Sequence, residues 1–181
     1  MKMRAWAAIG IASLLSSVAW GQADFATKQP SVKILNVESL PLQPGKSASV
    51  KLTFQVSPGF HINSNHPNSE MLIPTVLKLD PPTDLSLSNI QYPDGQQLSF
   101  PFAPDEKLSV YTGDFNVSAT ARTVGSIRVG RYRVHGELRY QACDDHACYP
   151  PKSVPVAFDV NVASPPKAPK HNPAQSPDVH N

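Results

Sequence analysis

The chain has 181 residues, 40% of them hydrophobic, and a formal net charge of +2. So small a charge argues against a surface built to bind nucleic acid or an acidic membrane. Nineteen prolines argue against a mainly helical protein, because proline breaks helix interiors and marks turns. We therefore expect one domain of strands and turns, with additional terminal segments.

Residues 1–21 have the features of a signal peptide. Lys2 and Arg4 are followed by an uncharged apolar stretch over 5–18, and Ala19 and Gly21 are small residues at the expected cleavage spacing. The apolar stretch is too short to be a convincing membrane span, although an uncleaved anchor is the alternative. We predict export to an oxidising compartment and no stable membrane insertion after cleavage.

Residues 31–163 read as short strands separated by turns. In chain order, the expected strands are 32–37, 49–56, 72–79, 85–90, 115–121, 131–140 and 154–162. Apolar and polar residues alternate most clearly over 49–56, 131–140 and 154–162, as in half-buried antiparallel strands. About seven such strands, with turn signals such as Pro58-Gly59 between them, predict an all-β antiparallel β-sandwich. Pro155 should lie at a sheet edge or a strand start, because it lacks an amide donor.

The last segment, 164–181, is rich in proline and contains no large apolar side chain except Val179. Such a composition buries too little surface to offset the entropy of ordering. We predict a disordered tail.

Cys143 and Cys148 are the two cysteines of the chain, and they lie in a short segment between the last two clear strands. In an exported protein, two close cysteines indicate one disulfide. A bond closing so small a ring contributes only about 2 kcal/mol in the chain-entropy model. This mildly favours a redox centre over a structural crosslink, but both interpretations remain open.

The loop between the cysteines bears on their reactivity. Asp144 and Asp145 disfavour a neighbouring thiolate, whereas His146 would favour it if protonated. The spacing is not the Cys-x-x-Cys of thioredoxin-type sites. We expect a poor free nucleophile, better suited to exchange controlled by docking of a partner.

The segment LRYQACDDHACYPPKSVPVAFDV resembles the active-site hairpin of the N-terminal periplasmic domain of the DsbD thiol:disulfide interchange family. The shared features are a Tyr-Gln-x-Cys start, a short loop, then Cys-Tyr-Pro-Pro and a strand rich in valine and proline. The upstream segments PGFHINSNHP and LSVYTGDF are also similar, so the resemblance covers about residues 32–162.

The resemblance implies an immunoglobulin-like sandwich that carries electrons in the periplasm, as a protein-disulfide reductase component. It implies that Cys148 forms the mixed disulfide with a partner and that Cys143 resolves it. Because the sequence continues into neither a membrane domain nor a thioredoxin domain, we expect redox partners in trans. These are thioredoxin-like or DsbD-type membrane redox proteins on one side and periplasmic disulfide-bonded proteins on the other.

Several positions near the predicted site differ from the family pattern or match it loosely. The loop between the cysteines is one residue shorter, and His61 and Asn63 replace family tyrosines. The family shields its disulfide with an aromatic side chain on a cap loop, a role open here to Phe100 or Phe102. The flanking tyrosines could pack over the disulfide or be ordinary residues of the sandwich rim; they are Tyr140 and Tyr149.

Two other functions are considered. One is an immunoglobulin-like binding or assembly domain whose disulfide is purely structural, which a reduction potential below about −300 mV would indicate. The other is a metal-handling protein that uses histidines and the cysteines, but Cys143-x-x-His146-x-Cys148 fits no usual zinc spacing. The further histidines in that hypothesis are His61 and His66. We expect no metal and no cofactor.

Overall fold

The computed structural model describes residues 29–35 and 37–164. The predicted signal peptide (1–21) and all but the first residue of the predicted tail (164–181) lie outside the described residues. Within the described residues the regular structure consists of twelve β-strands and no helix, which confirms the all-β prediction. Accordingly, no helix in this part of the chain could cross a membrane.

Two four-stranded sheets form the body of the molecule. The first has the order β1 (Val32–Ile34), β3 (Ser47–Val56), β9 (Asp114–Thr123), β6 (Leu85–Gln91), and all its pairs are antiparallel. The second has the order β2 (Leu40–Leu42), β12 (Lys152–Val162), β10 (Gly130–Tyr140), β5 (Val76–Asp80). In it only the short β2–β12 pair is parallel.

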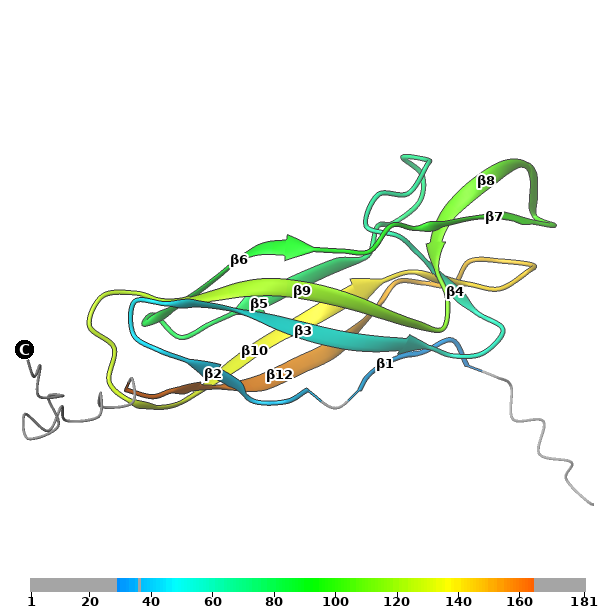
Figure 1. Ribbon diagram of the computed structural model, residues 1–181. Helices are drawn as coiled ribbons and strands as arrows, with labels where there is room; N and C mark the ends of the chain where they lie inside the picture. Colours follow the sequence, from blue (N-terminus) through cyan, green and yellow to red (C-terminus); the bar gives the residue numbers. More distant parts are fainter. Residues whose placement is uncertain (1–28, 36, 165–181) are drawn as a thin grey trace, which may run out of the picture.

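The two sheets face each other across one hydrophobic core, and Figure 1 shows them as an elongated sandwich. The apolar residues of the three clearest alternating segments point inward, as the period of two requires. Leu52 and Phe54 of β3 are fully buried, as are Val134 and Leu138 of β10. The predicted antiparallel sandwich is therefore confirmed, with an immunoglobulin-like arrangement of its two sheets.

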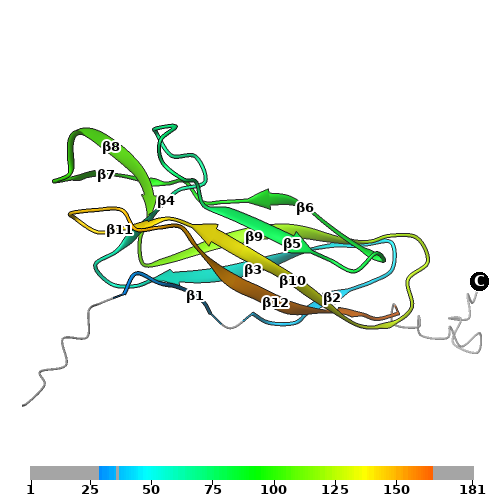
Figure 2. The ribbon, with the colours of Figure 1, turned by 180° about the vertical axis from the view of Figure 1, so that it is seen from behind.

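A third, smaller sheet lies at one end of the sandwich and is called the end sheet below. Its order is β11 (Ala142–Cys143), β4 (His61–Asn63), β8 (Ala103–Tyr111), β7 (Gln96–Phe100), all antiparallel. Figures 1 and 2 show the β7–β8 hairpin and the loop after β11 at this same end. The end sheet therefore brings together segments more than 80 positions apart in the sequence.

All seven predicted strands are present, with changed limits. The strand expected at 72–79 begins only at Val76, because Thr75 is tied to β4 by a hydrogen bond from its hydroxyl to the Asn63 carbonyl (2.5 Å). The strand expected at 32–37 ends at Ile34. Pro155 lies where β12 pairs with β10 on one side only, since β2 pairs only with Val160–Val162. Its predicted position at an open edge is confirmed.

Candidate redox site

The cysteines are joined in a disulfide at the tip of the hairpin between β10 and β12, as the sequence predicts. The Sγ–Sγ distance is 2.02 Å and the Cα–Cα distance is 4.0 Å. Cys143 ends β11 and is fully buried, at 0% exposure, whereas Cys148 is exposed. An approaching molecule therefore reaches Cys148 before Cys143.

Asp144 organises the loop between the two cysteines. Its Oδ1 accepts hydrogen bonds from the backbone amides of His146 (2.8 Å) and Ala147 (2.9 Å), which is an Asx-type turn. Its Oδ2 accepts a bond of 2.5 Å from the hydroxyl of Tyr149. These bonds, with that from Tyr149 foremost, lower the pKa of Asp144 to about 2, so the carboxylate is ionised at neutral pH.

The same hydrogen bond to Asp144 raises the pKa of the Tyr149 hydroxyl. The Tyr149 ring packs edge-on against Phe60, with centroids 5.9 Å apart. Tyr149 therefore bridges the loop to Asp144 through its hydroxyl and packs its ring on Phe60. The negative charge that the sequence places beside the cysteines thus also has a structural role.

His61 lies beside Cys143 in the end sheet. The two residues are register partners in the β4–β11 pair, so their side chains project from the same face. The neighbouring residues Ile62 and Ala142 point the other way, into the core of the sandwich. His61 and Cys143 therefore share the outer face of the end sheet, and both are buried.

Phe100, at the end of β7, covers His61. The two rings are stacked with centroids 3.8 Å apart, and the Phe102 ring continues the stack 5.7 Å beyond Phe100. Phe100 is 9% exposed and Phe102 is 37% exposed. Both aromatic side chains proposed for the cap are therefore gathered at the site, with Phe100 inside and Phe102 at the surface.

Burial governs the electrostatics of His61. The Nε2 atom is buried without a hydrogen-bond partner. Burial lowers the pKa of His61 to about 4, although Asp145 and Asp144 act in the opposite direction. His61 is therefore a neutral imidazole at neutral pH.

Asn63 occupies the same face two residues further along β4. Its Nδ2 donates to the carbonyl of Ile73 (3.0 Å) and to Oε1 of Gln141 (3.1 Å). Gln141 in turn donates to the backbone carbonyl of Tyr149 (3.3 Å). Asn63 thereby connects the loop after β4 to the hairpin that holds the cysteines, a link that the sequence did not reveal.

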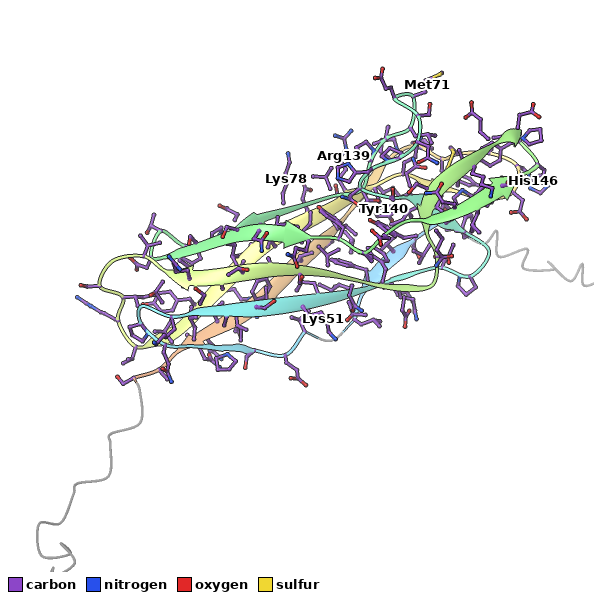
Figure 3. All side chains as sticks on the ribbon, turned by 45° about the horizontal axis from the view of Figure 1, so that its top comes forward. Lys51, Met71, Lys78, Arg139, Tyr140 and His146 are labelled. Carbon is purple, nitrogen blue, oxygen red and sulfur yellow. A yellow bond between two sulfur atoms is a disulfide. The ribbon has the colours of Figure 1, made fainter. Side chains whose placement is uncertain are left out.

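Tyr140 belongs to the core rather than to the surroundings of the disulfide. It is 3% exposed, and its hydroxyl accepts a hydrogen bond from the backbone amide of Val32 (3.2 Å). In Figure 3 it lies among the interior side chains, whereas His146 lies at the far end of the molecule. Of its two predicted roles, Tyr140 has that of an ordinary residue of the sandwich.

A shallow groove of about 490 Å³ lies next to the disulfide loop. Phe60, His61 and Phe100 line it together with Asp145 and the turns at 57–59 and 112–113. The groove therefore adjoins the disulfide loop at Asp145 and includes the aromatic rings of Phe60 and Phe100.

The histidines of the metal hypothesis are not gathered. His61 is buried under Phe100, while His66 and His146 are exposed. Over residues 29–35 and 37–164, no group of three or more His, Cys, Asp or Glu side chains is arranged to hold a metal ion.

The fold and the site together define a class: an immunoglobulin-like β-sandwich with a disulfide in a hairpin at one end. The family model described as thiol:disulfide interchange protein DsbD, N-terminal, matches residues 31–159. The chain therefore belongs to this family, which confirms the resemblance found in the sequence. It is a thiol–disulfide exchange domain in the general sense that the family defines.

Solved structures show similar folds at low sequence identity. The DsbD N-terminal domain of Neisseria meningitidis in the reduced form is 21% identical, covering 62% of this chain and 78% of that one, with a TM-score of 0.41. The N-terminal periplasmic domain of ScsB from Proteus mirabilis is 14% identical over 75% and 47% of the two chains, with a TM-score of 0.46. A comparison with curated protein sequences finds no match.

Proposed function

We propose that this chain is a periplasmic thiol–disulfide exchange module. It passes electrons between a thioredoxin-like or DsbD-type donor and periplasmic disulfide proteins, through the Cys143–Cys148 pair. The observation that carries the assignment of roles is the difference in burial, since Cys143 is fully buried and Cys148 is exposed. Disulfide exchange requires access of a thiolate to one sulfur, and Cys148 offers that access.

The exchange proceeds in two balanced steps. A donor thiolate attacks Sγ of Cys148, the Cys143–Cys148 bond breaks, and Cys143 leaves as a thiolate that takes up a proton. The donor's second thiolate then attacks its own sulfur in the mixed disulfide, leaving the donor oxidised and both cysteines reduced. The reverse sequence delivers the same two electrons to an oxidised acceptor, with Cys148 attacking and Cys143 resolving.

The β7–β8 hairpin, with Phe100 and Phe102, fits a shielding role in this scheme. The stack of Phe100 and Phe102 on His61 covers the face from which Cys143 projects. Small thiols then gain little access to the buried sulfur, whereas a docked protein can engage Cys148 at the edge. The groove beside the loop supplies apolar surface for that contact.

The test is to trap the mixed disulfide. A Cys143→Ser variant lacks the resolving thiol and should accumulate a covalent complex with a thioredoxin-like protein that retains one active-site cysteine. A Cys148→Ser variant is the matched control and should form none. Equal trapping by both variants would overturn the assignment of roles.

Absence of trapping by either variant would favour a structural disulfide in a binding domain. The reduction potential then gives an independent check. Structural disulfides lie below about −300 mV, and an exchange site is more oxidising.

A further inference from the structure

The loop between the cysteines is held closed by contacts that do not involve sulfur. The Asp144 carboxylate accepts hydrogen bonds from the amides of His146 and Ala147 and from the Tyr149 hydroxyl, at 2.8, 2.9 and 2.5 Å. Tyr149 immediately follows Cys148, and Asp144 immediately follows Cys143. The Asp144–Tyr149 hydrogen bond therefore ties together the two residues adjacent to the sulfurs.

Backbone hydrogen bonds support the same closed loop. The Asp144 amide donates to the carbonyl of Ala147 (3.0 Å), and the Tyr149 amide donates to the carbonyl of Ala142 (2.8 Å). Gln141 adds a side-chain bond to the carbonyl of Tyr149 (3.3 Å). None of these bonds requires the disulfide, so they can hold the two cysteines side by side when it is open.

We infer that Asp144 and Tyr149 are positioning residues for exchange: they hold the reduced cysteines close together and so favour closure of the disulfide. This inference rests on the proposed function and specifies how the site is tuned. A preorganised pair reacts as an intramolecular one, with a high effective concentration of one thiol at the other. The two residues therefore favour the oxidised form of this protein and shorten the life of the mixed disulfide.

The electron balance shows where the two residues act. In the mixed disulfide, the Cys143 thiolate attacks Sγ of Cys148, the bond to the partner breaks, and the partner leaves as a thiolate. Two electrons pass from the cysteine pair to the partner, and the new Cys143–Cys148 bond forms. A loop that stays closed keeps the attacking sulfur near its target, whereas an open loop must first reclose.

Three variants separate the geometry of the loop from its charge. Tyr149→Phe removes the hydroxyl but leaves the Asp144 carboxylate and the ring that packs on Phe60. Asp144→Asn removes the charge but keeps an oxygen that can accept both amides, and Asp144→Ala removes both. Asp145→Ala is the control for charge, because Asp145 is exposed and makes no side-chain hydrogen bond within the described residues.

The equilibrium with reduced and oxidised glutathione measures the effect, with acid quenching, alkylation and intact-mass analysis of each mixture. We expect Asp144→Ala to lower the effective concentration of the two thiols about tenfold, which raises the reduction potential by about 30 mV. Tyr149→Phe should lower the effective concentration by a smaller factor. The effective concentration in Asp144→Asn should be closer to that of the unmodified protein than the value for Asp144→Ala. Asp145→Ala gives the effect of removing one loop charge alone, and we expect its shift to be smaller than that of Asp144→Ala.

The mixed disulfide provides a kinetic readout that altered folding alone would not move. Mixed with an oxidised thioredoxin-like protein, the reduced Tyr149→Phe variant should hold its mixed disulfide longer than the unmodified protein. Far-ultraviolet circular dichroism checks that each variant remains folded.

If the unmodified protein exchanges but both Tyr149→Phe and Asp144→Ala match the Asp145→Ala control, the inference alone is overturned. If the unmodified protein exchanges with no thioredoxin-like protein, the proposed function fails and the inference fails with it.

Discussion

The buried imidazole of His61 makes a quantitative prediction about stability and pH. Its pKa is about 4 in the folded protein, against 6.5 for an ordinary histidine, because burial penalises the charged form. Between these two values the unfolded chain binds a proton that the folded protein does not. Acid therefore favours unfolding, and the stability present above pH 6.5 is lost as the pH falls toward 4.

The magnitude follows from the size of the pKa shift. A group shifted from 6.5 to about 4 lowers the free energy of unfolding by about 2 kcal/mol between about pH 7 and pH 4.5. The loss should be steepest near pH 5, where the slope approaches about 1.4 kcal/mol per pH unit. This is a large part of the stability of a small domain.

Urea unfolding of the oxidised protein, at several pH values between about 4.5 and 7, measures this loss. A His61→Phe variant is the matched control, since its ring can still stack on Phe100 but cannot take a proton. Both proteins share their other titrating groups, so the difference between their two curves isolates the contribution of His61.

We expect the difference between the two free energies of unfolding to change by about 2 kcal/mol over this range. Parallel curves would refute the reasoning, because they would show that His61 titrates alike in both states. Direct titration of the His61 ring by nuclear magnetic resonance gives a second check, with an expected pKa of about 4.

Three further substitutions have defined outcomes. Gly136→Ala places a Cβ 2.3 Å from the Lys78 carbonyl oxygen, so it should cost about 1–3 kcal/mol in a denaturant titration. Tyr140→Phe removes the acceptor of the buried Val32 amide and should cost about 1 kcal/mol in the same measurement. Phe100→Ala uncovers the outer face of the end sheet, so reduction by dithiothreitol should be several times faster, as followed by alkylation and mass analysis. An unchanged reduction rate would contradict the shielding role.

The body of the sandwich could be predicted from the sequence because its longest strands bury one face. The alternation over β3, β10 and β12 reports that one-sided burial directly. β4 escaped detection because it has only three residues, too few for a period of two to be recognised. The β7–β8 hairpin escaped because residues 104–107 of β8 are all exposed and mostly charged, which resembles a loop.

The site was predictable in its chemistry and less so in its contacts. Cysteine count and family resemblance identified the sulfur pair, and resemblance also indicated His61 and Phe100. Their stacking joins residues 39 positions apart through the end sheet, and no local pattern encodes it. The turn around Asp144 did leave a signal, because aspartate in a short loop commonly accepts amides two and three residues ahead.

The end sheet has a small apolar cluster of its own, formed by Phe100, Leu108 and Val110, separate from the main core. A hairpin held by so few buried side chains can open locally at a lower free energy than global unfolding. Backbone amides of β7 and β8 should then exchange with deuterium well before those of β3 and β10. Access to the sulfurs thus depends on the end sheet, whereas the global stability depends on the core of the sandwich. Substitutions in one of these two parts could change one property without the other.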